Sequence, residues 1–180
     1  MKKLSILVAI FLIGVLAVSC GGTEAKAVKT GFASDTTIAD SISADGATNG
    51  EGAGYSKVVG VLVDEDGVIV DCVIDAVQTK IEFSSAGKIV TSLDTTFDSK
   101  NVLGDAYGMK AASGIGKEWN EQAAFLADYV VGKTIEEVKG IALDAEGTAT
   151  DEELLAGVTM HIGPYIAVIE KAVANATDLG

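Results

Sequence analysis

The sequence predicts an α+β fold in a single domain, with a twisted antiparallel sheet of β-hairpins packed against helices. Two observations predict it. Paired β-branched, apolar runs lie at 57–74 and 80–93, and each pair is joined by a short turn that ends in glycine. Apolar residues then recur at helical spacing over 117–131 and 164–176. Hairpins followed by helices favour a sheet with helices covering one face.

Residues 1–19 are predicted to be a lipoprotein signal peptide. A short cationic start precedes an almost wholly apolar run over 4–18, which ends at Ser19 and Cys20. The cysteine after small residues resembles a bacterial lipobox, which implies cleavage before Cys20 and diacylation of its thiol. The mature protein would then be lipid-anchored at the extracytoplasmic face of the cell membrane. An uncleaved anchor helix is the alternative, and it leaves the domain in the same place.

Residues 20–54 are predicted to form the lipidated cysteine and a flexible tether rich in glycine, serine and threonine. Small and polar residues dominate this stretch, and 49–54 has the composition of a loop. The folded domain is therefore expected to span 55–180.

The charge balance argues against a nucleic-acid partner. The chain carries 26 Asp and Glu against 13 Lys and Arg, a formal net charge of −13. Of the two cysteines, Cys72 lies within a predicted strand and is expected to be a buried, inert thiol. No cluster of His, Cys and carboxylate residues in the sequence predicts a metal site.

The first hairpin is expected to pair 57–63 with 68–74, and the second to pair 80–83 with 88–93. Glycine ends each turn because these positions require a positive φ. Further along, Thr134 is expected to cap a short helix, with Glu137 completing a capping box.

The loop Ser113-Gly114-Ile115-Gly116 precedes the first predicted helix. Paired glycines let a backbone approach a ligand closely, and N–H groups at a helix start favour an anion. A glycine-rich helix entry with no ligand is the alternative interpretation.

Thr159 is the second candidate position. Glu153 lies six residues before it, Gly157 two residues before it, and Pro164 suits the first turn of the helix that follows. That helix start would offer free N–H groups and a partial positive charge to a phosphate.

An earlier stretch, Asp45-Gly46-Ala47-Thr48, shares part of this pattern. Ile42 stands where the acidic residue would be, and no amphipathic helix follows. A plain loop is therefore the favoured interpretation of Thr48.

The stretch 153–159 resembles the flavinylation site of the FMN-binding domain family, whose motif reads Asp-x-x-Ser/Thr-Gly-Ala-Thr/Ser. That family includes FMN-carrying subunits of the Rnf and sodium-translocating NADH:quinone reductase complexes, and flavin lipoproteins of extracellular electron transfer. Glu153 stands for the Asp, Ala156 for the Ser/Thr and Val158 for the Ala.

The loop 113–116 is similar to the family's Glu-Thr-Pro-Gly-Ile/Leu-Gly loop, with Ala111, Ala112 and Ser113 in place of Glu-Thr-Pro. The ordered set of motifs covers 55–176, and the residues within these motifs are most similar to those of the pheromone-lipoprotein-like branch of the family.

The resemblance implies an electron carrier rather than a turnover enzyme. It implies FMN esterified through its phosphate to the Thr159 hydroxyl by a separate flavin transferase, and electrons from a membrane donor linked to quinol or to an NADH dehydrogenase. The other residues expected to bind the cofactor are Gly157, Gly114, Gly116, Ser113, Trp119 and Met109.

Tyr107 and Ile115 are further candidates to wall the flavin ring, with ordinary core packing as the alternative for each candidate wall residue. His161 is expected to share a side with Thr159, and a surface position is favoured for it. Two other functions stay open: a noncatalytic solute-binding or surface lipoprotein, and the precursor of a pheromone-type signal peptide.

Overall fold

The computed structural model describes residues 27–178, and its sheet has four strands. All neighbouring strands are antiparallel, in the order β3-β2-β1-β4. The bounds are β1 (Val28–Thr37), β2 (Gly50–Asp64), β3 (Ile69–Phe83) and β4 (Thr177–Asp178).

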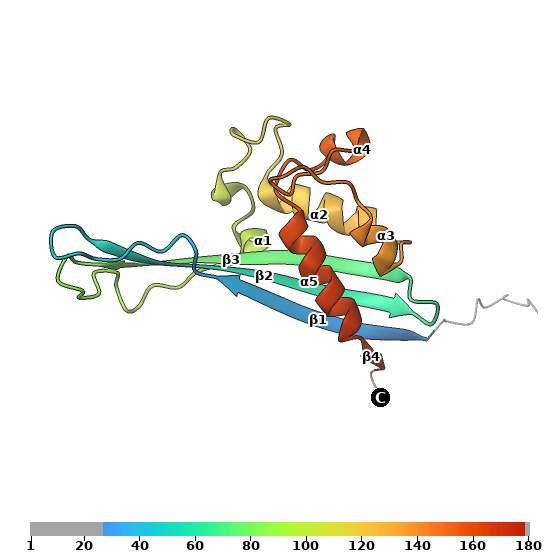
Figure 1. Cartoon of the computed structure of the whole chain (residues 1–180), viewed down its shortest axis with the longest axis horizontal. Helices are drawn as coiled ribbons and strands as arrows, with labels where there is room; N and C mark the ends of the chain where they lie inside the picture. Colours follow the sequence, from blue (N-terminus) through green and yellow to red (C-terminus); the bar gives the residue numbers. More distant parts are fainter. Residues whose placement is uncertain (1–26, 179–180) are drawn as a thin grey trace, which may run out of the picture.

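The helices lie over one face of this sheet (Figure 1). They are α1 (Lys100–Leu103), the 3-10 helix η1 (Gly104–Tyr107), α2 (Trp119–Val130), α3 (Ile135–Lys139), α4 (Glu152–Leu155) and α5 (Gly163–Ala174). Helix α2 packs on β3, and α5 packs on β1 and β2. The expected α+β class is confirmed, and both predicted helices form close to their expected bounds.

The expected flexible tether is wrong from Val28 onward. Strand β1 pairs with β2 along its whole length, from Val28 opposite Asp64 to Thr37 opposite Tyr55. The small residues that indicated flexibility serve packing instead, since a Cβ at Gly31 would lie 2.0 Å from the Ala172 carbonyl oxygen of α5. Residues 50–54 also belong to β2. The signal peptide, Cys20 and the start of the tether lie outside the described residues.

The first predicted hairpin forms, and the second forms only in part. Gly67 adopts a φ of +79° in the turn between β2 and β3, as the sequence predicted. Residues 88–93 are not a strand, because their pairing with β3 is limited to a single bridge between Phe83 and Ile89. The Thr91 hydroxyl then accepts from the Glu82 N–H at 2.7 Å, which replaces the next backbone pairing.

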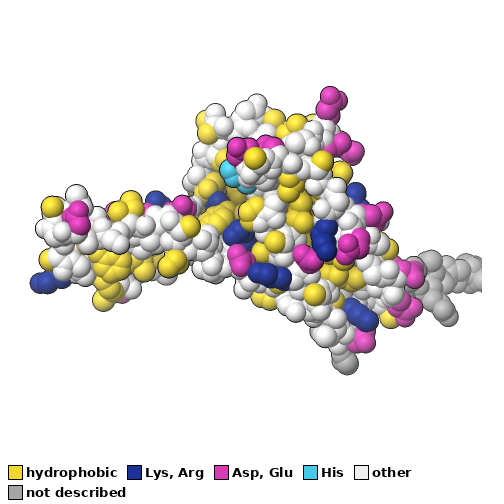
Figure 2. Space-filling model, viewed as in Figure 1, with side chains coloured by type: hydrophobic (Ala, Val, Ile, Leu, Met, Phe, Trp, Pro, Cys, Tyr) yellow, Lys and Arg dark blue, Asp and Glu magenta, His cyan; other side chains and the backbone are white. Residues whose placement is uncertain are grey.

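The arm of the molecule consists of β2 and β3 beyond the end of β1, with the loops that join them to their neighbours. It projects from the wider body that the helices cover (Figure 2). Exposed apolar side chains on the arm are Ile38, Ile42, Ile81, Ile89, Val90 and Leu93.

The core lies between the helices and the covered face of the sheet. Its fully buried members include Val59, Ile69, Leu126, Leu154 and Ile169. The Cys72 thiol is also buried, as the sequence predicted, and burial raises its pKa to about 12. Within the described part of the chain, no helix has the length and apolar composition needed to cross a membrane.

The close approach of α5 to β1 predicts that Gly31→Ala destabilises the fold. The added methyl would overlap a backbone carbonyl that cannot move independently of its helix, so we expect a loss of about 1–3 kcal/mol in unfolding free energy. Gly60→Ala is the matched control, because nothing lies within 4 Å of a Cβ at Gly60. Chemical denaturation of both variants checks this, and equal stabilities would contradict it.

Candidate functional site

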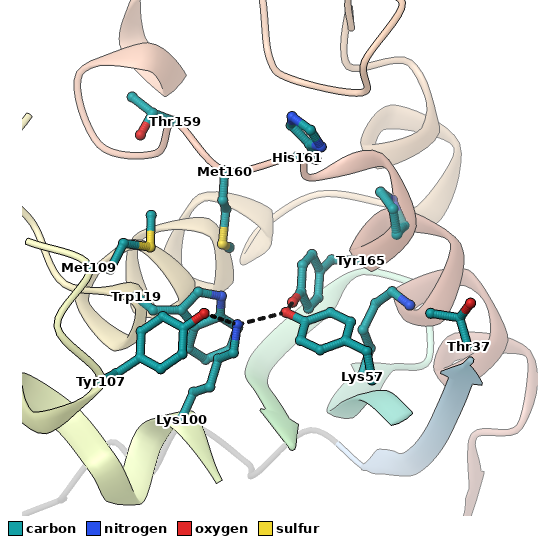
Figure 3. A pocket seen from close by; sticks show the side chains of 12 residues that line it. Thr37, Lys57, Lys100, Tyr107, Met109, Trp119, Thr159, Met160, His161 and Tyr165 are labelled. Carbon is teal, nitrogen blue, oxygen red and sulfur yellow. Dashed lines mark hydrogen bonds between the residues drawn. The ribbon is translucent and has the colours of Figure 1, made fainter. Parts of the chain in front are cut away.

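A cavity of about 460 Å³ opens where the sheet meets the N-terminal ends of α2 and α5. This volume is within the range of small-molecule sites. Half of its twelve lining residues carry aromatic rings or thioethers, and most of the others are polar (Figure 3). The aromatic and sulfur-bearing residues are Tyr55, Tyr107, Met109, Trp119, Met160 and Tyr165. The remaining lining residues are Thr37, Lys57, Lys100, Thr159, His161 and Pro164.

The ammonium group of Lys100 lies among aromatic rings, and the residue is only 4% exposed. Its Nζ donates to the Tyr107 hydroxyl at 2.7 Å and to the Tyr55 hydroxyl at 3.0 Å. The same atom lies 4.2 Å from the Tyr107 ring centroid, 4.6 Å from that of Tyr55 and 5.1 Å from that of Trp119. These contacts give the cation two acceptors and three negative ring faces.

Lys100 forms no ion pair with any carboxylate among residues 27–178. Burial without a counter-charge lowers its pKa to about 8. Its position is fixed by the next residue, because the Asn101 amide donates to the Ile74 carbonyl of β3 at 2.9 Å. The four-residue helix α1 is therefore anchored to the sheet and delivers Lys100 to the cavity.

The tyrosine hydroxyls extend this network across the cavity. Tyr55 and Tyr165 share a hydrogen bond of 2.6 Å, and the Tyr165 ring lies 6.0 Å from that of Trp119. Burial raises the pKa of Tyr55, Tyr107 and Tyr165, so each phenol stays protonated at neutral pH. The chain Lys100–Tyr55–Tyr165 links α1, β2 and α5 through polar atoms.

Lys57 is the second buried lysine of the cavity, and its environment differs. Its Nζ lies 3.5 Å from Asp35 Oδ2, and Lys171 contacts the other oxygen of that carboxylate at 3.1 Å. These contacts, with the Lys171 hydrogen bond first, lower the pKa of Asp35. Lys57 thus has a carboxylate partner, which it shares with Lys171, whereas Lys100 has none among the described residues.

The fully buried Gln122 of α2 holds the loop that carries Thr159. Its Oε1 accepts from the Thr159 N–H at 2.8 Å and from the Met160 N–H at 3.2 Å. The Thr159 hydroxyl donates to the Ser113 carbonyl at 3.0 Å and also lies 3.3 Å from Gln122 Oε1. The two loops that the sequence singled out therefore lie side by side.

The loop before α2 is held by buried polar side chains. Both carboxylate oxygens of Glu118 accept backbone N–H groups at 2.9 Å, from Met109 and Lys110. Burial opposes the charge of Glu118, but these hydrogen bonds outweigh it and lower the pKa. The Ser113 hydroxyl accepts from the Lys117 N–H at 3.0 Å. Met109 is thereby placed at the cavity wall.

Three of the predicted cofactor-binding residues, Met109, Trp119 and Thr159, line the cavity. Tyr107 also lines it, whereas Ile115 does not. His161 is exposed and borders the same cavity. Whether any of these residues binds a cofactor stays a prediction.

The predicted glycines are close to the cavity in sequence but do not line it. Gly114 and Gly116, which were expected to bind the cofactor, adopt φ values of +68° and +66° and shape the loop. At Gly157 a Cβ would lie 2.2 Å from the Phe125 ring. Gly157 is therefore required by packing against α2.

The expected anion site at the start of α5 is wrong. The N–H groups of Ile162 and Gly163 both donate to the Gly147 carbonyl, at 2.8 and 3.0 Å, and Pro164 has no N–H. The Tyr165 N–H donates to the Ile162 carbonyl at 2.9 Å. A neighbouring turn therefore already occupies the N–H groups that the sequence analysis assigned to a phosphate.

Sequence reasoning missed Lys100, Lys57, Tyr55, Tyr165 and Met160. A signal existed for one pair: Tyr55 and Lys57 alternate in register with buried Val59 and Val61, which places a lysine on the covered face of β2. Lys100 begins a helix too short for periodicity to detect. Among residues 27–178, no group of three metal-ligating side chains gathers at this cavity or elsewhere.

Removing the Gln122 acceptor should loosen the Thr159 loop. Gln122→Met keeps the side-chain length but leaves two N–H groups without an acceptor, so we expect a loss of about 1–3 kcal/mol in unfolding free energy. Asn120→Ala is the control on the same helix, because the buried Asn120 Oδ1 has no hydrogen-bond partner. Thermal and urea unfolding measure the stability of both variants, and hydrogen exchange measures the protection of the Thr159 and Met160 amides. A Gln122→Met protein of unchanged stability, with slow exchange at both amides, would refute the role of Gln122 in holding this loop.

The lowered pKa of Lys100 predicts a pH-dependent stability. Between its folded value of about 8 and its ordinary value of 10.5, the unfolded chain binds more protons than the folded protein, so stability rises with pH. The unfolding free energy of the natural protein minus that of Lys100→Met should grow by about 2 kcal/mol from pH 8 to pH 10. A flat difference over this window would show that Lys100 titrates like an exposed lysine.

Comparison with known proteins gives one partial match. The chain is 35% identical over 92 residues to a protein named chlorophenol reductase from Desulfitobacterium hafniense, and the match covers 45% of this chain. It covers 28% of that relative, so the chain corresponds to little more than a quarter of the relative's length. No family model and no solved structure matches the chain.

Proposed function

We propose that the protein is a membrane-anchored, extracytoplasmic flavoprotein that carries FMN as a phosphoester on Thr159 and relays electrons. The observation that carries the proposal is the cavity itself. Thr159 borders it, and aromatic rings and thioethers surround a buried lysine there.

The cavity suits a flat, largely apolar ring with polar edges. Trp119, Met109 and Met160 offer apolar surface, and the hydroxyls of Tyr55 and Tyr165 offer hydrogen bonds from one side. The isoalloxazine of FMN has this character, and when bound it supplies reversible uptake and release of electrons. The donor set of the cavity is therefore compatible with the cofactor that the resemblance implies.

Esterification of the Thr159 hydroxyl would leave the backbone contacts of its loop in place. Esterification would remove its hydrogen bond to the Ser113 carbonyl, but the Gln122 amide would still accept from the Thr159 and Met160 N–H groups. The loop would thus keep its path after the cofactor is attached. The hydroxyl that would be modified is thus distinct from the N–H groups through which Gln122 holds the loop.

The phosphate of an attached FMN would meet side chains instead of the start of α5. Lys57 and His161 line the same cavity and are the candidates to face it. This differs from the sequence expectation, because the N–H groups of Ile162 and Gly163 are already paired.

A covalent cofactor is suited to a protein outside the cytoplasmic membrane, where a free one would diffuse away. Under this proposal the lipid on Cys20 holds the domain at the membrane, a flavin transferase attaches the FMN, and a quinol- or NADH dehydrogenase-linked donor reduces it. The name of the relative, chlorophenol reductase, fits a redox setting. A noncovalent solute in the same cavity is the competing function.

The test is coexpression with a flavin transferase followed by intact mass and peptide mapping. The mature protein should gain the mass of one FMN less one water, located on Thr159, and Thr159→Ala should lose both the mass gain and the yellow colour. Thr48→Ala is the control, since Thr48 lies in an exposed turn with its hydroxyl bonded to Asp45 at 2.8 Å. A colourless natural protein beside an active transferase, or flavin on Thr48, would exclude the proposal.

A further inference from the structure

The unbalanced charge of Lys100 has a consequence for any ring that occupies the cavity. Taking a lysine out of water without a carboxylate is unfavourable, and two phenols with three ring faces compensate only in part. A ligand that brings negative charge close to this ammonium would supply the missing counter-charge. A neutral ligand would leave the lysine as it is.

We propose that Lys100 is the charge partner of the bound flavin ring and makes the cavity favour the ring's reduced, anionic form. The inference rests on the proposed function, because it takes the flavin ring as the occupant. Lys100 is then a positioning residue that sets the reduction potential of the cofactor carried by Thr159.

The redox balance determines the sign of the effect. The neutral oxidised ring takes up two electrons from the membrane donor and one proton at N5, and it becomes singly negative. A fixed positive charge near the opposite edge stabilises the product more than the reactant. Lys100 should therefore raise the reduction potential, and a neutral residue in its place should lower it.

The second lysine of the cavity provides a matched comparison. Lys57 is buried to a similar degree, but Asp35 lies 3.5 Å from its Nζ. That carboxylate, which Lys171 also contacts, offsets part of the Lys57 charge, so Lys57 should discriminate less than Lys100 between the two charge states of the ring. The two lysines of the cavity are therefore expected to affect flavin binding differently, because only Lys57 has a carboxylate partner among the described residues.

Lumiflavin, which lacks the phosphate, is the probe for the unmodified cavity. The full chain carrying Thr159→Ala is titrated with oxidised lumiflavin and, without oxygen, with reduced lumiflavin at pH 7. We expect the reduced probe to bind at least about tenfold more tightly, and Lys100→Met to abolish that ratio. Lys100→Gln should abolish it equally, since its amide keeps a hydrogen bond to the phenols but has no charge. Lys57→Met should retain most of it.

The loaded protein gives an independent readout. A tenfold change in the affinity ratio corresponds to about 30 mV for a two-electron couple, so the midpoint potential of Lys100→Met and Lys100→Gln proteins should fall by at least that amount. Circular dichroism verifies the fold of each variant, and Lys100→Gln serves where the Met variant does not fold.

The outcomes separate the two proposals. An affinity ratio that is unchanged in both Lys100 variants, or equally changed in Lys57→Met, overturns the role of Lys100. Absence of lumiflavin binding to every folded variant overturns it as well. A ratio that depends on Lys100, in a natural protein that never gains FMN on Thr159, supports the charge role and rejects the covalent carrier.

Discussion

The close contact between α5 and the sheet is the constraint on which the rest of the structure depends. The Ala172 carbonyl lies so near Gly31 that only a residue without a side chain fits in β1 at that point. This approach places Tyr165, at the opposite end of α5, within hydrogen-bond distance of Tyr55 on β2. It also fixes where the chain enters the helix, and hence where the loop with Thr159 and His161 lies. Small residues near the N-terminus thereby determine the shape of a cavity built mainly from later segments.

Buried polar side chains then organise the loops above the sheet. Gln122 and Glu118 both belong to the first turns of α2 or its cap, and both accept backbone N–H groups of irregular segments. Removing such groups from water is unfavourable unless they are paired, so each bond also specifies a single loop path. The N-terminal end of α2 therefore holds both the loop before α2 and the loop with Thr159, and Trp119 at the same end lines the cavity.

The cavity combines this order with an electrostatic imbalance. In a chain of net charge −13, a lysine buried without a carboxylate among the described residues departs from the usual pairing of buried charges. Its phenol and ring contacts reduce the unfavourable free energy without neutralising the charge. Departures of this kind are typical of functional sites, where stability is given up for binding or chemistry. The proposed flavin site and the role of Lys100 both follow from that departure.

The sequence by itself determined the elements whose signals are local. Alternating apolar residues and the turn at Gly67 predicted the hairpin of β2 and β3, helical periodicity predicted α2 and α5, and the capping box at Thr134 is present as expected. These features depend on neighbours a few residues apart, so a linear pattern is sufficient to specify them.

Only the tertiary structure decided the features that depend on distant contacts. The small residues of β1 have the composition of a flexible tether, but pairing with β2 makes them a strand, and α5 packs against it. Gly147 occupies the N–H groups at the start of α5, which the sequence left free for an anion. Lys100 and Tyr55 are 45 residues apart, yet they form a hydrogen bond and both line the cavity. Burial and charge pairing depend on contacts between residues that are far apart in the sequence, so patterns along the chain did not predict them.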